Sequence, residues 1–157
     1  MAQIVVLNGD VVDYDHRIDW HSIGTDVAVY GHTAPAQVLA RVAGATIVVI
    51  KELPMSGALL RQFPASVKMI VEAGTGYNNY DAAALKERGI ALTNIPAYST
   101  QRVAHTAIML MLNLASSMQT QLAMLAQGDH RNFSDHLLVD HIELNGKTLG
   151  VIGFGHI

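Results

Sequence analysis

The sequence predicts an α/β fold in which a parallel β-sheet carries crossover helices on both faces. Short β-branched apolar runs recur at regular spacing, and segments with helical signals lie between them. Such runs are typical of strands buried on both faces, and the alternation of strand and helix favours a parallel sheet. The predicted strands cover residues 4–7, 27–30, 46–50, 67–71, 90–95 and 148–152.

Polar residues mark the expected ends of the short helices between these strands. Thr33, Ser56 and Asp81 each precede a helical pattern, and their side chains are suited to accept a hydrogen bond from the first turn. Gly89 follows the predicted helix over residues 82–88 and is placed to end it in a left-handed conformation.

A long apolar helix is expected after Pro96. Ser99 or Thr100 would cap it, it would cover residues 101–127, and Gly128 would end it. Its middle is apolar almost all round, and a helix without a polar face is buried on every side. We therefore expect it to pack between two domains or against another subunit, with an ordinary methionine-rich core helix as the alternative.

Composition excludes several classes of protein. The chain has 157 residues, 50% of them hydrophobic, no cysteine, 10 Lys plus Arg and a net charge of −3. The size and apolar content predict a globular, soluble protein, and the lack of cysteine excludes disulfides and thiolate sites and favours the cytoplasm. No basic surface for nucleic acid, no signal peptide and no membrane span of roughly 18 apolar residues is indicated.

The polar segment over residues 128–147 is expected to be a surface loop. It is rich in histidine and aspartate, but His136 and His141 have a spacing that suits neither one helix face nor one strand face. The sequence therefore predicts no metal site. It also lacks the sequence motifs of a serine-hydrolase elbow, a P-loop and a zinc protease, so it gives no indication of a self-contained hydrolase.

Two glycine turns follow predicted strands. Gly74, Thr75 and Gly76 follow the strand over residues 67–71, where consecutive free amides could hold a carboxylate or phosphate. An ordinary strand-to-helix turn is the alternative. Lys51 follows another strand and would favour an anion at the same edge.

The second turn contains Gly153, Phe154 and Gly155 after the strand predicted over residues 148–152. Its first two glycines match the start of a G-x-G-x-x-G dinucleotide fingerprint, in which backbone amides approach a pyrophosphate. A plain turn is the alternative for this half-motif.

Several ordered motifs together resemble one family, the D-isomer-specific 2-hydroxyacid dehydrogenases, which include glycerate, D-lactate and D-3-phosphoglycerate dehydrogenases. The similarity covers essentially the whole chain in the right order. Its motifs lie in residues 51–54, 67–70, 73–81, 86–90, 93–100, 103–104 and 144–157. At His105 the chain departs from the acidic or amide residue that many members carry.

The resemblance implies a flavodoxin-like parallel sheet followed by the first elements of a Rossmann domain. Residues 1–98 would form the N-terminal part of the substrate domain, and residues 99–157 the truncated start of the NAD-binding domain. The helix over residues 101–127 would join a homodimer interface in the full-length protein. The length of 157 residues then represents most of one domain and the first strand of another.

The resemblance also assigns roles to single residues. The amides of Gly74, Thr75 and Gly76 would hold a substrate carboxylate, Thr75 would also lie near the nicotinamide, and Lys51 would line the cleft. The turn over the cofactor pyrophosphate would comprise Gly153, Phe154, Gly155, His156 and Ile157. The catalytic arginine, acidic residue and histidine of the family fall in its second half, so no catalytic residue is expected in this chain.

The implied activity is that of an NAD(P)-dependent oxidoreductase that transfers a hydride between nicotinamide and a small D-2-hydroxy acid or 2-oxo acid. NAD is favoured over NADP, and the chain alone is expected to be inactive and prone to self-association. The alternatives are a non-catalytic module that binds small anions or pairs with an intact family member, and a truncated product without function.

Overall fold

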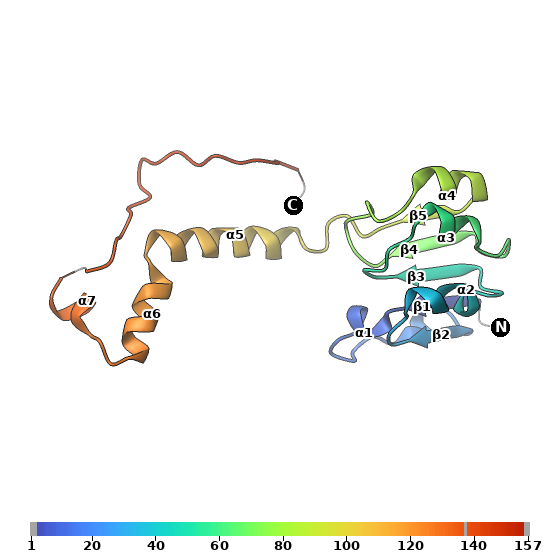
Figure 1. Ribbon diagram of the computed structural model, residues 1–157, viewed down its shortest axis with the longest axis horizontal. Helices are drawn as coiled ribbons and strands as arrows, with labels where there is room; N and C mark the ends of the chain where they lie inside the picture. Colours follow the sequence, from blue (N-terminus) through green and yellow to red (C-terminus); the bar gives the residue numbers. More distant parts are fainter. Residues whose placement is uncertain (1–2, 137, 156–157) are drawn as a thin grey trace. The chain divides into compact units, whose positions relative to one another are not determined.

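The computed structural model describes residues 3–136 and 138–155. The chain divides into two compact units, Met1–Pro96 and Ala97–Ile157. The first unit contains the sheet and the second consists of helices and extended chain (Figure 1).

The first unit contains a five-stranded, fully parallel sheet in the order β2-β1-β3-β4-β5 (Figure 1). The first five predicted strands are confirmed, with ends that differ by no more than two residues. The strands are β1 (Ile4–Leu7), β2 (Val27–Tyr30), β3 (Ile47–Ile50), β4 (Met69–Glu72) and β5 (Ala91–Thr93).

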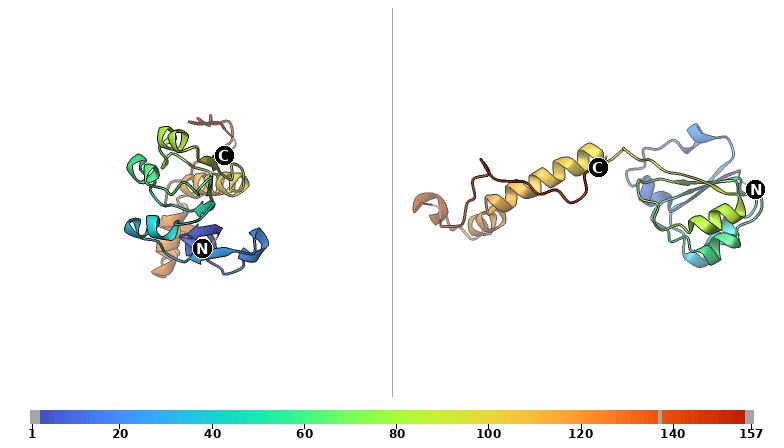
Figure 2. Two further views of the ribbon diagram at one scale, coloured as in Figure 1. Left: turned by 90° about the vertical axis from the view of Figure 1, so that its right-hand side faces the viewer. Right: turned by 90° about the horizontal axis from the view of Figure 1, so that it is seen from above.

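Helices cover both faces of this sheet, as the sequence predicts. The chain moves one way from β1 to β2 and the opposite way from β2 through β5, so right-handed crossovers place the β1–β2 connection on one face and the later helices on the other. Figure 2 shows α2, α3 and α4 on the same face. The helices are α1 (Gly9–Val12), η1 (Trp20–Ile23), η2 (Pro35–Gln37), α2 (Val38–Arg41), α3 (Gly57–Arg61) and α4 (Ala82–Arg88).

The core of this unit lies between the sheet and the helices α2, α3 and α4. Alternate residues of the central strands point to the same face, because successive side chains of a strand alternate. Their side chains pack against apolar residues of the helices and of the loops that follow them. This buried cluster includes Val5, Leu7, Val38, Val42, Val48, Ile50, Leu60, Phe63, Ile70 and Leu85.

Two predicted caps are confirmed and one is wrong. Ser56 Oγ and Asp81 Oδ1 accept hydrogen bonds from the backbone of α3 and α4, and Gly89 ends α4 at a φ of 62°. Thr33 does not cap a helix, since its side chain is buried and accepts from the Arg41 guanidinium. A 3-10 turn, η2, opens that segment instead.

In the second unit, the single helix predicted over residues 101–127 is wrong, because the chain forms α5 (Thr100–Ala115) and α6 (Met118–Ala126) with a bend of 66° between them. Ser117 adopts a left-handed conformation with φ of 50°, and its hydroxyl donates to the carbonyl of Asp140. Gly128 ends α6 with φ of 73°, as predicted.

No residue of α5 or α6 is buried by the described part of the chain. Leu114 is 77% exposed, and Leu110 and Leu112 are also exposed. The burial expected for this helix therefore does not come from the residues that the structure describes.

A helix can cross a membrane only if its apolar length suffices. Within residues 3–136 and 138–155, no single helix is long and apolar enough to cross a membrane, although α5 and α6 meet that requirement together as a bent pair.

After α6 the chain is largely irregular, as predicted for residues 128–147. The described residues of this stretch form one short helix, α7 (Arg131–Ser134). The strand predicted over residues 148–152 is wrong, because this segment pairs with no strand among the described residues and Val151 is exposed. A strand without a hydrogen-bonded neighbour lacks the ladder that stabilises it.

A substitution at Asp81 tests the cap of α4, where the loop that follows β4 ends. Asp81→Ala removes the acceptor for the Ala84 amide, and we expect the free energy of unfolding to fall by about 1 kcal/mol. Asp81→Asn keeps an acceptor and should stay close to wild type. Urea unfolding followed by circular dichroism measures both, and an unchanged midpoint for the alanine variant would contradict the assigned cap.

Candidate functional site

A pocket of about 380 Å³ lies where the carboxyl ends of β3 and β4 meet. Ligands bind at this edge in open α/β sheets because several loops converge there. Residues 52–54 line the pocket, together with Lys51, Glu72, Gly74, Gly76, Asn78 and Asn79. Lys51, Gly74 and Gly76, predicted from two separate strand ends, are therefore brought together.

The glycine loop, residues 74–76, is hydrogen-bonded to the segment that follows β5. The Ile95 amide donates to the Gly74 carbonyl at 2.9 Å, and the Thr75 hydroxyl donates to the Ile95 carbonyl at 3.0 Å. The Asn94 side-chain amide donates to the Thr75 carbonyl at 2.7 Å. These bonds use the carbonyl groups and the hydroxyl of the loop.

The amide groups of the same loop remain available. Among the described residues, the backbone N–H groups of Gly74, Thr75 and Gly76 donate no hydrogen bond. Consecutive free amides of this kind can bind an anionic oxygen. Thr75 thus contributes its amide, while its hydroxyl serves to anchor the loop.

Lys51 supplies positive charge directly beside this loop. Its backbone carbonyl accepts from the Asn8 side-chain amide at 3.1 Å, and its ammonium lies 3.6 Å from Glu52 Oε1. A Cβ atom on Gly74 would stand only 2.7 Å from Lys51 Nζ. The ammonium group therefore occupies the space that a side chain at position 74 would fill.

Glu72 and Tyr80 form a buried polar pair that the sequence prediction missed. The Tyr80 hydroxyl donates to Glu72 Oε2 at 2.7 Å, and Glu72 is 3% exposed. Burial, and then the hydrogen bond to Glu72, raise the pKa of Tyr80 well above its usual value. A charged residue directly after a buried strand was the available signal, but the pairing with Tyr80 depends on the loop between them.

The opposite side of the pocket is tied to the same loop. The Asn79 side chain donates to the Leu53 carbonyl, and the Met55 amide donates to the Asn79 carbonyl, both at 3.1 Å. Gly76 stays open, since a Cβ there would have only Asn78 Oδ1 within 4 Å. Hydrogen bonds therefore tie residues 53–55 to the loop, while the space beside Gly76 stays open.

The second predicted turn does not form a cradle within the described residues. Gly153 has a φ of 91°, no atom lies within 4 Å of a Cβ built on Gly153 or Gly155, and Phe154 is 97% exposed. His156 and Ile157, which were predicted to complete this turn, lie outside the described residues.

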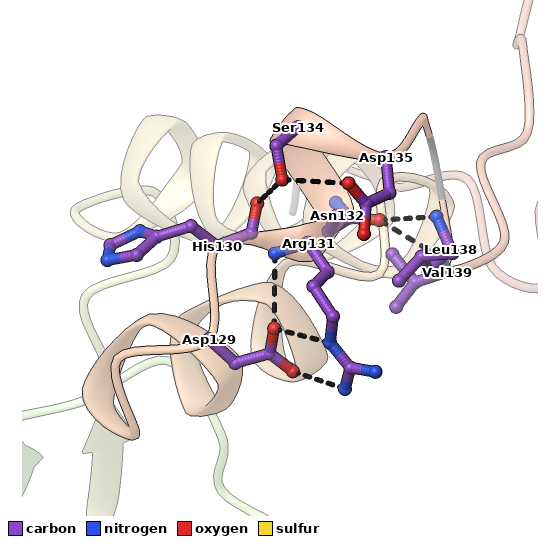
Figure 3. Close-up of polar contacts among 8 residues, drawn as sticks. All are labelled: Asp129, His130, Arg131, Asn132, Ser134, Asp135, Leu138 and Val139. Atoms are coloured by element: carbon purple, nitrogen blue, oxygen red, sulfur yellow. Dashed lines mark hydrogen bonds and ion pairs between the residues drawn. The ribbon is translucent and has the colours of Figure 1, made fainter.

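A smaller pocket of about 220 Å³ in the second unit contains none of the predicted site residues. Asp129, which lines it, is already paired with Arg131 at 2.8 Å (Figure 3), and these hydrogen bonds lower the pKa of Asp129 to about 2. Across the part of the chain that the structure describes, no group of three or more His, Asp or Glu side chains is arranged to hold a metal ion.

The burial of Tyr80 predicts how the free energy of unfolding depends on pH. In the unfolded chain Tyr80 loses its proton near its ordinary pKa of 10.0, whereas in the folded chain it keeps the proton. The folded state then binds more protons, so the free energy of unfolding should fall as pH rises above about 10. Tyr80→Phe should flatten this fall, at a cost of about 1–3 kcal/mol near pH 7 because Glu72 loses its donor.

Denaturant unfolding between about pH 8 and pH 11 measures this difference. Tyr14→Phe controls for the loss of a phenol, since the Tyr14 side chain is exposed. An alkaline slope that is the same in wild type and Tyr80→Phe would contradict the buried pair.

Comparison with known proteins shows the family to which the chain is similar. The family model described as D-isomer specific 2-hydroxyacid dehydrogenase, catalytic domain, matches residues 5–129. A hydroxypyruvate reductase from Blautia hydrogenotrophica is 31% identical over 162 aligned positions, which cover 99% of this chain and 50% of that protein. A glycerate dehydrogenase from Methylorubrum extorquens is 32% identical over 77% of this chain and 39% of its own length.

Solved structures share the fold. A glyoxylate reductase from Paecilomyes thermophila matches with a TM-score of 0.80 at 23% identity, over 99% of this chain and 49% of that one. D-2-hydroxyisocaproate dehydrogenase matches with a TM-score of 0.77 at 24% identity, over 98% and 46%. The chain thus spans about half the length of the relatives it matches. By its family match and its relatives, this chain belongs to the D-isomer-specific 2-hydroxyacid dehydrogenase family.

Proposed function

We propose that this chain supplies the substrate-carboxylate site of an NAD(P)-dependent oxidoreductase that interconverts small D-2-hydroxy acids and 2-oxo acids by hydride transfer. One observation carries the proposal: the free amides of Gly74, Thr75 and Gly76 lie in the loop that borders the pocket, and the ammonium of Lys51 lies against Gly74. Membership of the family supports the reaction class.

The division of labour follows from this chemistry. The loop amides would donate charge-assisted hydrogen bonds to the two oxygens of a carboxylate, and such bonds are stronger than bonds between neutral groups. Lys51 would add long-range attraction for the anion. Residues 1–98 would thus form the N-terminal part of the substrate domain, and we assign no proton-transfer residue to this chain.

NAD is the cofactor that the relatives favour. A D-2-hydroxyacid dehydrogenase (NAD+) from Lacticaseibacillus paracasei and a D-lactate dehydrogenase from Aquifex aeolicus complexed with NAD and lactic acid are among the matches. A match to an imino acid reductase in complex with NADPH keeps NADP as the alternative. Because the described part of the 153–155 turn forms no cradle, residues 99–157 are proposed only as the start of the nucleotide domain, and no step is assigned to them.

We further propose that a second copy of the chain covers α5. The helix exposes apolar side chains along its length, among them Leu110, Leu112 and Leu114. Exposed apolar patches of this kind mark interaction surfaces, and paired copies of one chain most often meet about a two-fold axis. Such a homodimer would supply the burial that the apolar sequence of α5 requires.

The carboxylate site can be tested on the ¹⁵N-labelled chain by titration with D-lactate. We expect the backbone amide signals of Gly74, Thr75 and Gly76 to shift with a single dissociation constant. Lys51→Ala should weaken binding by roughly 5- to 10-fold, since a nearby charge contributes on the order of 1 kcal/mol. Lys68→Ala, at the exposed amino end of β4, serves as the matched control. Shifts confined to other residues, or equal affinity in the two variants, would contradict the site.

The proposed pairing through α5 can be tested by sedimentation velocity. We expect the wild-type chain to associate at micromolar concentration and Leu110→Glu with Leu114→Glu to shift it toward monomer, because a buried carboxylate is costly. Lys86→Glu on the exposed face of α4 adds the same charge elsewhere and should leave association unchanged. A wild-type chain that is monomeric and melts cooperatively at these concentrations would count against this interface.

A further inference from the structure

Glu72 has one carboxylate oxygen that no other described residue uses as an acceptor. Its Oε2 atom is bonded to the Tyr80 hydroxyl, whereas its Oε1 atom accepts no hydrogen bond from the described residues. Glu72 nevertheless lines the pocket and is only 3% exposed. Because Oε1 is not among the fully buried atoms without a partner, it is open to the pocket, where a bound molecule can supply a donor.

The direction of this oxygen is fixed. Tyr80 is itself buried and holds the other oxygen at 2.7 Å, so the carboxylate plane cannot turn freely. Glu72 Oε1 lies 3.0 Å from the position of a Cβ on Gly74, on the same spot that Lys51 Nζ approaches to 2.7 Å. The free acceptor therefore stands beside the first residue of the carboxylate-binding loop.

A substrate anchored on that loop presents its C3 substituent close to its own carboxyl group, since C3 is only two carbon–carbon bonds away. A hydroxyl on C3 can donate to Glu72 Oε1. A methyl group cannot, and it would also keep water away from this oxygen without replacing the hydrogen bond that water could make. A second carboxylate would face the Glu72 charge, while Lys51 already has an ionic partner in Glu52 at 3.6 Å.

We infer that Glu72 is a specificity-determining residue that selects 2-hydroxy and 2-oxo acids with a hydroxyl group on C3, by accepting a hydrogen bond from that hydroxyl at Oε1. The inference rests on the proposed carboxylate site at residues 74–76. Tyr80 acts as a positioning residue, because it aims the carboxylate of Glu72.

The test compares D-glycerate with D-lactate, which differ only in the hydroxyl on C3. Dissociation constants come from amide shifts of Gly74 to Gly76 in the 157-residue chain. We expect D-glycerate to bind about 10-fold more tightly than D-lactate, in line with a hydrogen bond to a charged acceptor. Glu72→Gln, which keeps an acceptor for Tyr80, should reduce this preference, and Glu72→Leu should abolish it.

The variant Tyr80→Phe provides a second test, in which Glu72 itself is unchanged. It should lower the affinity for D-glycerate several-fold and leave that for D-lactate unchanged, an effect that a purely structural role would not produce. The amide spectrum of each variant reports whether it remains folded.

The other outcomes separate this inference from the proposed function. If both acids shift the loop amides with equal affinity, or if Glu72→Gln weakens both equally, the selection of a C3 hydroxyl is overturned while the carboxylate site stands. If neither acid shifts these amides, the carboxylate site itself is overturned, and the inference falls with it.

Discussion

The parallel register between β3 and β4 is the constraint on which the candidate site depends. It sets Ile50 opposite Glu72, and the Ala73 amide donates to the Ile50 carbonyl at 2.8 Å, one step beyond the paired residues. The residue directly after β3 is Lys51, and its side chain enters the space beside Gly74. A shift of register by one residue would reverse which face each side chain occupies and separate this charge from the free amides.

This arrangement requires glycine at position 74. Lys51 Nζ and Glu72 Oε1 both lie within about 3 Å of where a side chain would begin. Gly76 carries no such restriction, and its open surface faces the pocket. The loop therefore combines one glycine that makes room for charged groups with another that leaves the backbone accessible. Hydrogen bonds from Ile95 and Asn94 to the carbonyls of Gly74 and Thr75 hold the loop in place.

Among the described residues, only Tyr80 donates a hydrogen bond to the carboxylate of Glu72. Tyr80 satisfies one oxygen, and the other is available at the pocket, an arrangement that costs stability unless water or a ligand supplies a donor. Binding sites often retain polar groups of this kind because they discriminate between ligands that can and cannot complete the hydrogen bond. Stability and selectivity thus depend on the same pair of residues.

Local sequence determined much of the first unit. The β-branched runs placed five strands, and Ser56, Asp81 and Gly89 fixed helix ends through bonds to their own neighbours. The failures involve distant partners: Ser117 breaks the long helix while bonding Asp140, and residues 148–152 lack a strand to pair with.

The residues of the candidate site likewise fall into those that the sequence predicted and those that it did not. Lys51 and the glycine loop were predictable because strand ends of a parallel sheet converge. The Glu72–Tyr80 pair and the anchoring of Thr75 by Ile95 were not, since they depend on how the connecting loops fold back.

The most direct measurement is a crystal structure of the chain with D-lactate bound. It should place a carboxylate oxygen within hydrogen-bond distance of the Thr75 and Gly76 amides, whereas a ligand bound elsewhere, with these amides turned away, would contradict the account.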